Sequence, residues 1–238
     1  MKSVEFLDEG INDKGIFKVV FMAGTPGSGK STVIDKVSNA SVKPRILDID
    51  KSFEHVSTKD GRNADDIAWM LFGKKSLGMH KQLLYDSLNS MLPMFIDGTG
   101  ANPKTLLHRE SILTSMGYDT MMIWVDTDLE TANERMKDRP RKLDNDLIKQ
   151  FYNRVMGTKN EYKAHFGSDF IEIDNNGDNF ELIQSRVYNQ VNQFFNSAIE
   201  NPNGKRNLQA MQDRGIKYLT DLIPGSLIKN SVNTWWYK

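Results

Sequence analysis

The segment from residue 24 to residue 31 constrains the fold of this chain more than any other. It reads GTPGSGKS, which fits the pattern G-x-x-x-x-G-K-[ST]. An apolar run over residues 16–22 precedes it, and a helical pattern over residues 30–37 follows it. This strand–loop–helix order is the context in which the motif binds phosphate. The sequence therefore predicts an α/β fold with a phosphate-binding loop (P-loop).

Apolar runs and helical patterns continue to alternate along the chain, which predicts βαβ units around a parallel sheet. We expect residues 51–92 to be mainly helical, with a break at Gly73 and Gly78. One long helix is expected over residues 145–162. The runs expected as strands are residues 16–22, 45–49, 94–96, 120–125 and 170–173.

The segment Asn201-Pro202-Asn203-Gly204 reads as a break in the chain. It divides an α/β domain over residues 1–200 from a C-terminal extension over residues 201–238, in which we expect one helix and a tail. The tail carries Trp235, Trp236 and Tyr237, which are expected to pack back on the domain. The alternative is that they form a contact with a subunit or partner.

Composition excludes several classes of protein. Acidic and basic residues balance at 31 each, so no overall field favours nucleic acid or a membrane surface. The absence of cysteine excludes disulfides and thiolate metal ligands. No stretch approaches the roughly 18 apolar residues of a membrane span, and no signal peptide is recognised. We expect a soluble cytoplasmic protein without a membrane partner.

The P-loop predicts ATP and Mg²⁺ as cofactors. Its glycines let backbone N–H groups converge on phosphate oxygens, and the following helix adds its positive end. Lys30 is expected to reach the β- and γ-phosphates, and the Ser31 hydroxyl to ligate Mg²⁺. The predicted nucleotide-binding residues are Gly24, Thr25, Pro26, Gly27, Ser28, Gly29, Lys30, Ser31 and Thr32.

Acids at the ends of the predicted strands supply candidates for the chemistry, because ligands of open α/β sheets bind beyond the carboxyl ends of strands. Asp50 is the candidate general base, and Asp48 is a candidate to hold the metal. Asp97 is a candidate to orient the acceptor or a metal-bound water. For each acid the competing interpretation is a turn or capping carboxylate.

Arg135 and Arg139 lie four residues apart, so they share one face of a predicted helix. Their segment, about residues 135–145, is expected to form a lid whose guanidinium groups stabilise charge on a transferred phosphoryl group. The competing interpretation is a solvated, charged helix end.

At these residues the chain resembles the P-loop kinases that include polynucleotide kinases and zeta-toxin kinases. The sequence LDIDKSF around Asp50 is similar to the segment that carries their catalytic aspartate. Asp97-Gly98-Thr99-Gly100 is similar to the zeta-toxin segment that touches the acceptor, which has Glu at the first position. The resemblance implies a five-stranded parallel sheet, Arg139 as a lid arginine, residues 175–178 near adenine, and a phage origin with residence in the host cytoplasm.

The acceptor is expected to be a hydroxyl of a nucleic acid or nucleotide, such as a 5′ end or a hydroxymethylated pyrimidine base in phage DNA. Basic residues of an acceptor-side insertion over residues 51–92 support this hypothesis. Two alternatives stay open: a zeta-toxin-like kinase of nucleotide sugars, and a P-loop ATPase without a small-molecule acceptor. The predicted acceptor-binding residues are Asp97, Thr99, Lys74, Lys75 and Arg109.

Overall fold

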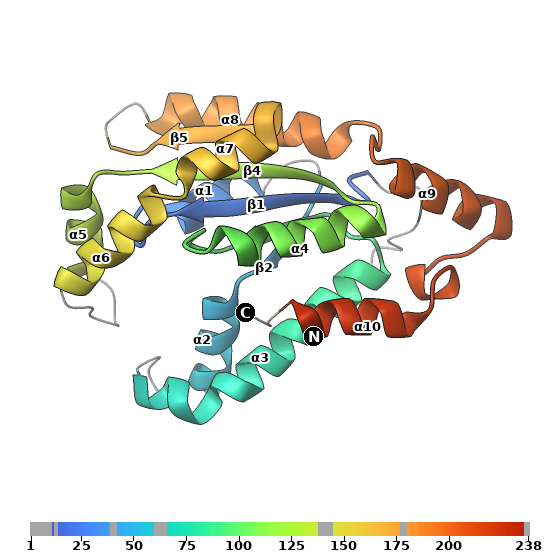
Figure 1. The fold of residues 1–238 in the computed structure, drawn as a ribbon, viewed down its shortest axis with the longest axis horizontal. Helices are drawn as coiled ribbons and strands as arrows, with labels where there is room; N and C mark the ends of the chain where they lie inside the picture. Colours follow the sequence, from blue (N-terminus) through green and yellow to red (C-terminus); the bar gives the residue numbers. More distant parts are fainter. Residues whose placement is uncertain are drawn as a thin grey trace, which may run out of the picture.

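The structure is a computed structural model that describes residues 11, 14–38, 42–59, 66–137, 145–176 and 180–235. Its centre is a five-stranded parallel sheet of order β2-β3-β1-β4-β5 (Figure 1). The predicted α/β class, a parallel sheet flanked by helices, is confirmed, and strand ends differ from the predicted ones by at most two residues. The strands are β1 (Lys18–Gly24), β2 (Arg45–Leu47), β3 (Met94–Asp97), β4 (Asp119–Asp126) and β5 (Phe170–Asp174).

The central strand β1 shows why the chain folds in three layers. Side chains alternate between the two faces of a strand. Val19 and Phe21 therefore pack into one hydrophobic core, and Val20 and Met22 pack into the other. All of β1 is buried, as expected for a parallel sheet that is covered on both faces.

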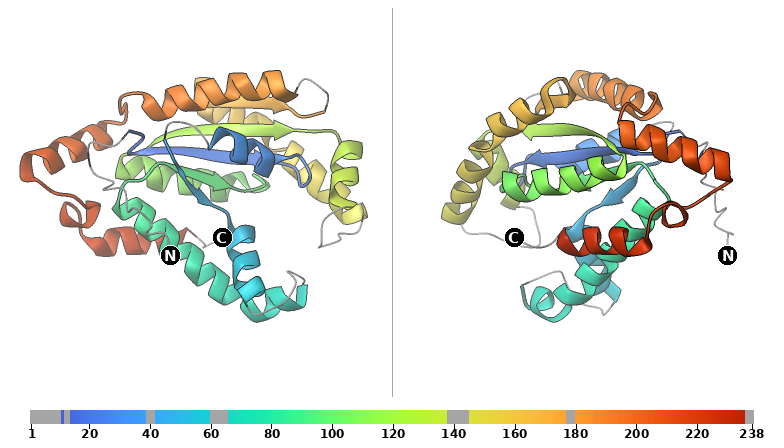
Figure 2. Two further views of the ribbon diagram at one scale, coloured as in Figure 1. Left: turned by 180° about the vertical axis from the view of Figure 1, so that it is seen from behind. Right: turned by 45° about the vertical axis from the view of Figure 1, so that its right-hand side comes forward.

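Helices α3, α4 and α7 contribute to the core on one face of the sheet, and α1 and α8 contribute to the core on the other (Figures 1 and 2). Within the described ranges, no helix has the length and apolar character needed to cross a membrane. The helices are α1 (Lys30–Val37), α2 (Ile49–Lys59), α3 (Asp66–Asn89), α4 (Pro103–Met116), α5 (Leu129–Lys137), α6 (Asn145–Met156), α7 (Lys159–Phe166), α8 (Phe180–Asn196), α9 (Pro202–Arg214) and α10 (Gly225–Thr234), with short 3-10 turns η1 (Gly167–Asp169) and η2 (Leu219–Asp221).

In its described residues, the segment predicted as an acceptor-side insertion contains two helices, α2 and α3, that pack against each other. The predicted break at Gly73 and Gly78 is wrong, since α3 continues through both residues. A glycine inside a helix costs only about 1 kcal/mol relative to alanine. The packing of α3 against α2 and α10 outweighs that local preference.

The single helix predicted over residues 145–162 is also wrong, because two helices, α6 and α7, meet there. The Thr158 hydroxyl ends α6 by donating to the Val155 carbonyl oxygen at 2.7 Å. The same hydroxyl lies 3.0 Å from the carbonyl oxygen of Gly100, which follows β3. The break therefore coincides with a contact between Thr158 and a distant loop.

The C-terminal extension is more helical than predicted. The segment from Asn201 to Gly204 starts a helix, because the Asn201 side chain accepts hydrogen bonds from the Asn203 and Gly204 backbone N–H groups. Two helices, α9 and α10, follow where one was expected. At Gly204 an added Cβ would lie 2.2 Å from the carbonyl oxygen of Gly117, so only glycine allows α9 to approach the end of α4.

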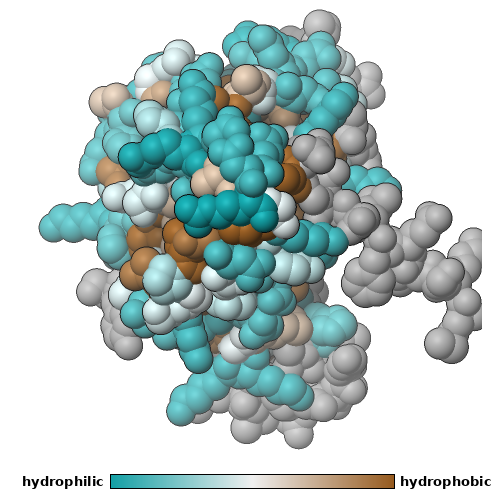
Figure 3. All heavy atoms as spheres, turned by 90° about the vertical axis from the view of Figure 1, so that its right-hand side faces the viewer, coloured by the Kyte–Doolittle hydropathy of each residue, from teal (hydrophilic) through white to brown (hydrophobic). Residues whose placement is uncertain are grey.

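The extension packs on the domain through its last described residue. Trp235 is only 2% exposed and belongs to the larger core, so this residue of the tail packs back on the domain as predicted. The rest of the predicted tail, residues 236–238, lies outside the described residues. Figure 3 views the molecule from the side of the extension, where an apolar band runs between hydrophilic side chains.

Candidate active site

The P-loop connects β1 to α1 at the carboxyl end of the sheet. Gly24, Gly27 and Gly29 have φ angles of 147°, 84° and 88°, which favour glycine over residues with a side chain. Space imposes the same choice, since a Cβ at Gly24 would lie 2.3 Å from the carbonyl oxygen of Val125. The glycines therefore let the loop curve tightly against the end of β4.

Polar groups of the loop are arranged to receive an anion. Lys30 Nζ donates to the carbonyl oxygens of Gly24 at 2.9 Å and Thr25 at 3.0 Å. The buried hydroxyl oxygens of Thr25 and Ser28 have no hydrogen-bond partner in the described structure. Ser31 is half-buried in the first turn of α1, where helical N–H groups lack intrahelical partners. These groups fit the phosphates of a nucleotide.

Sheet register brings two of the predicted acids to the same place. Leu47 of β2 pairs with Ile96 of β3, and the next residue after each of them is an acid, Asp48 and Asp97 respectively. Asp48 Oδ1 accepts from the backbone N–H groups of Asp50 at 2.8 Å and Lys51 at 3.2 Å, so this carboxylate caps α2. The structure thus gives Asp48 a capping role, and its role in holding the metal stays a prediction.

Burial perturbs the carboxyl group of Asp97. Burial raises its pKa to about 6, the Lys30 charge opposes that rise, and the Asp48 and Asp50 charges add to it. Its Oδ1 atom is buried without a hydrogen-bond partner in the described structure. The structure therefore gathers Lys30, Asp48, Asp50 and Asp97 into one electrostatic cluster. Asp50 is the exposed member, in the first turn of α2.

The residues present fit Mg²⁺ together with a nucleotide. In the described part of the chain, no group of three or more His, Cys, Asp or Glu side chains forms a metal site. Mg²⁺ is commonly held by one or two protein groups, with waters and phosphate oxygens completing its shell. Ser31 follows Lys30 in the sequence, and the charges of Lys30 and Asp48 act on Asp97. Ser31, Asp48 and Asp97 are therefore the residues that would supply those groups.

Arg135, one of the two predicted lid arginines, is linked to the P-loop through Asn175, the residue that follows β5. Arg135 donates to the carbonyl oxygen of Asn175 at 3.1 Å. The Asn175 side chain, only 5% exposed, donates to the carbonyl oxygen of Ser28 at 2.6 Å. Asn175 was expected near adenine, and its contact with the loop backbone was not foreseen. Arg139 and most of the predicted lid lie outside the described residues.

The predicted acceptor residues divide into two groups. Thr99 belongs to the site, because its carbonyl oxygen accepts from the Gly24 backbone N–H at 3.2 Å while its side chain is exposed. Lys74 and Lys75 are exposed on α3, and no contact joins them to the acidic cluster in the described structure. Arg109 lies on α4, where its Nε donates to the carbonyl oxygen of Trp235 at 3.1 Å.

A buried histidine joins α3 to the acidic cluster. His80 is 4% exposed, and its Nδ1 lies 3.4 Å from the Ser52 hydroxyl of α2. Burial lowers its pKa to about 4; the nearby Asp48 charge opposes the shift and the Arg109 charge adds to it. The imidazole is therefore neutral at pH 7.

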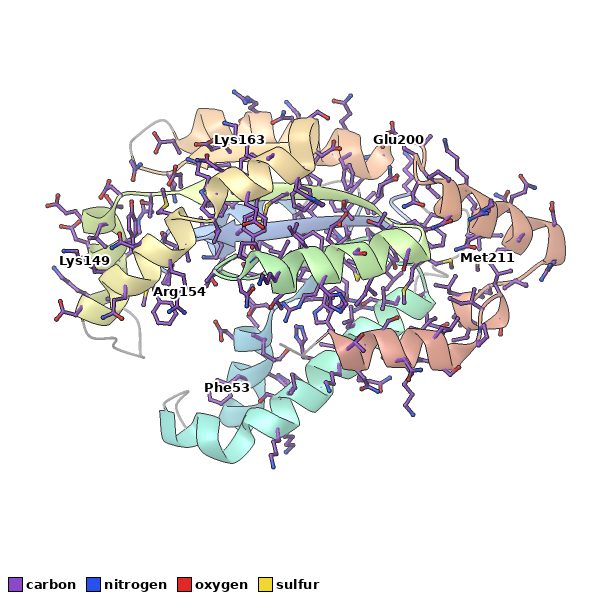
Figure 4. All side chains as sticks on the ribbon, viewed as in Figure 1. Phe53, Lys149, Arg154, Lys163, Glu200 and Met211 are labelled. Carbon is purple, nitrogen blue, oxygen red and sulfur yellow. The ribbon has the colours of Figure 1, made fainter. Side chains whose placement is uncertain are left out.

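The site lies where the carboxyl ends of the strands face α2, α5 and α6. Figure 4 shows Phe53 on α2 and Arg154 on α6, which lie on two sides of this end of the sheet. The guanidinium of Arg154 lies 5.8 Å from the centre of the Phe151 ring. The arrangement combines an anion-binding loop, a lysine, clustered carboxylates and an arginine, which are the groups that phosphoryl transfer requires.

Comparison with known proteins agrees with this geometry. A family model described as an AAA domain matches residues 19–156, which is more than half of the chain. No curated protein matches the sequence.

Solved structures resemble the fold. A proposed kinase from Chloroflexus aurantiacus is 14% identical, with a TM-score of 0.50 over 74% of this chain and 97% of that one. Shikimate kinase from Acinetobacter baumannii, in complex with shikimate, is 19% identical, with a TM-score of 0.45 over 73% and 92%. Deoxyadenosine kinase from M. mycoides, with bound dATP, is 14% identical, with a TM-score of 0.45 over 73% and 99%.

Proposed function

The chain belongs to the AAA domain family, whose model covers residues 19–156, and from this premise we propose that it is a Mg²⁺- and ATP-dependent kinase. It transfers the γ-phosphate to a hydroxyl group of a nucleic acid or nucleotide. The observation that carries the proposal is the cluster of Lys30, Asp48, Asp50 and Asp97 beyond neighbouring strand ends. A loop that binds phosphate and a carboxylate that accepts a proton are two of the parts that transfer to an alcohol uses.

The residues divide the work as follows. Lys30 leaves its loop carbonyl partners to bind the β- and γ-phosphates, and Ser31 ligates the metal. Mg²⁺, when bound, neutralises charge on the phosphates. Asp50 takes the proton of the attacking hydroxyl, and its exposure on α2 leaves it accessible to an acceptor. Asp97 and Thr99 hold the acceptor beside the loop.

Arginine residues complete the proposed mechanism. Arg135 already reaches the loop through Asn175, so it can stabilise charge on the phosphoryl group without a large movement. Arg139 is proposed as the second lid arginine, because it lies one helical turn further along the sequence.

Basic residues favour a nucleic-acid or nucleotide acceptor. Lys74 and Lys75 are exposed on the acceptor-side insertion, where phosphate contacts would be salt-dependent. A 5′ end and a hydroxymethylated pyrimidine base are the specific candidates. A phage origin has no support among the comparisons and stays a prediction.

The proposal is tested by supplying γ-labelled ATP with a panel of nucleosides, nucleotides, 5′-hydroxyl DNA and RNA, hydroxymethylated DNA and nucleotide sugars. Label on a nucleic acid or nucleotide supports it. Label on a nucleotide sugar alone identifies the toxin-like kinase instead. ATP turnover that no acceptor accelerates, with no labelled product, identifies an ATPase and overturns the kinase proposal.

A further inference from the structure

The acceptor segment, residues 97–100, has an exposed part and a buried part. Gly98 and Thr99 are exposed after the end of β3, whereas Gly100 is buried. The Thr99 carbonyl oxygen accepts from the Gly24 backbone N–H at 3.2 Å, which joins the segment to the first residue of the P-loop. The exposed part therefore borders the loop, and the position of the segment depends on what holds its buried end.

Two elements close around Gly100. A Cβ added there would lie 2.9 Å from the Ala23 Cβ of β1 and 3.3 Å from Cε2 of Tyr162 in α7. The Tyr162 hydroxyl donates to the Gly100 carbonyl oxygen at 2.9 Å. Tyr162 is fully buried, and its ring centre lies 6.1 Å from that of Trp124. Tyr162 is thus a fixed donor to the buried end of the acceptor segment.

Thr158, the residue before α7, brings a second donor to the same oxygen. Its hydroxyl oxygen lies 3.0 Å from the Gly100 carbonyl oxygen and 2.7 Å from the Val155 carbonyl oxygen. A hydroxyl has one proton and gives a full hydrogen bond to one acceptor at a time. Each carbonyl also has another donor, the Tyr162 hydroxyl for Gly100 and the Thr158 backbone N–H at 3.0 Å for Val155. Neither oxygen loses all its donors when the proton turns to the other, so the exchange costs little.

The two acceptors of the Thr158 hydroxyl belong to different sides of the proposed site. Gly100 ends the acceptor segment, and Val155 lies in the last turn of α6. Helix α6 packs against α5, which carries Arg135. In Figure 1, α6 runs from the start of α7 toward α5. Thr158 therefore stands between the segment proposed to hold the acceptor and the helices on the arginine side.

We propose that Thr158 couples the acceptor segment to α6. A shift of residues 97–100 when an acceptor binds changes which carbonyl oxygen receives the Thr158 proton, and so changes how firmly the end of α6 is held. Thr158 acts through Gly100 and Val155, so it is a positioning residue. The inference rests on the proposed kinase function and adds to it a link between occupation of the acceptor site and the arginine side.

The kinetic test uses the acceptor that gains label in the panel described above, with full-length variants. Thr158→Val removes the hydroxyl and keeps the branched shape. It should raise the KM for the acceptor about 2–10-fold, the range of one neutral hydrogen bond, and leave the KM for ATP unchanged. Thr158→Ser keeps the hydroxyl and should restore the acceptor KM. An unchanged acceptor KM in Thr158→Val, or an equal rise in both KM values, overturns the inference.

Thr234→Val is the matched control. The Thr234 hydroxyl donates to the Ser231 carbonyl oxygen at 3.0 Å at the end of α10, the same three-residue spacing as from Thr158 to Val155. Within the described residues, this hydroxyl has no partner in a distant segment. Thr234→Val should leave both KM values unchanged, and a rise in the acceptor KM like that of Thr158→Val overturns the inference.

A second measurement needs neither acceptor nor nucleotide. Hydrogen exchange of the free protein is followed by mass spectrometry in the same variants. Thr158→Val should speed the exchange of amides in both residues 98–101 and residues 153–158, and Thr158→Ser should restore both. Acceleration confined to residues 153–158, as expected of a local helix end, or acceleration of neither segment, overturns the inference. If no acceptor gains label, the kinase function is refuted, while exchange still decides whether Thr158 joins the two segments.

Discussion

The side-chain amide of Asn175 donates to the carbonyl oxygen of Ser28 across 2.6 Å, and so joins the end of the last strand to the P-loop. The Asn175 backbone carbonyl oxygen also accepts a hydrogen bond from the Arg135 guanidinium. One buried residue therefore supports the loop and positions an arginine. An added Cβ at Gly29 would lie 2.4 Å from the same amide nitrogen, so the P-loop and the segment after β5 approach each other closely.

This contact predicts that Asn175→Ala weakens ATP binding as well as stability. The substitution leaves the buried Ser28 carbonyl oxygen without its donor, which should cost about 1–3 kcal/mol in the free energy of unfolding. ATP affinity, measured by calorimetry, should fall with it. Asn176→Ala is the matched control, because Asn176 bonds to Thr127 and Asp128 and not to the loop. Equal ATP affinity in both variants would contradict the prediction.

Lys30→Ala should abolish transfer while the protein stays folded. Lys30 is half-buried, and its ammonium donates to the carbonyl oxygens of Gly24 and Thr25 within the loop. Loss of its charge removes stabilisation of the transferred phosphoryl group. Product formation from labelled ATP and the circular dichroism melting curve are the two measurements. A variant with near-normal transfer would remove the P-loop lysine from the mechanism.

Asp48 and Asp50 should respond differently to substitution, although they are neighbours in sequence. Asp50→Asn should cut transfer about 10²–10⁴-fold, the usual contribution of a general base, with little loss of stability because Asp50 is exposed. Asp48→Ala should lower the free energy of unfolding by about 0.5–2 kcal/mol, since it removes the cap of α2. If Asp50→Asn instead lowers Mg·ATP affinity at an unchanged rate, Asp50 serves the metal.

Sequence reasoning located the strands because each is a short apolar run, and it found Lys30 and the acids because they follow those runs. It failed where distant contacts accompany the local structure. The break before Thr158 coincides with a contact to Gly100, and the chain offers no local signal for it beyond Gly157. Arg109 could be chosen for its charge, but its partner Trp235 comes from an extension that no periodic pattern connects to α4.

Asp97 gives a prediction for the pH dependence of stability in the protein without nucleotide. Burial raises its pKa from 3.8 to about 6 in the folded state. Between these values the folded protein binds the proton more tightly than the unfolded chain, so stability falls as the pH rises through this window and then levels off.

Asp97→Asn cannot ionise. It should match the wild type below pH ~4 and be more stable by about 1–3 kcal/mol above pH ~6. Urea unfolding at pH 4 and pH 7.5 measures the difference in the free energy of unfolding. A wild type that gains stability relative to the variant as the pH rises would contradict the prediction. It would show that neighbouring charges hold the pKa of Asp97 below its usual value. A variant that gains stability but loses transfer would indicate a carboxylate kept for function at a cost in folding.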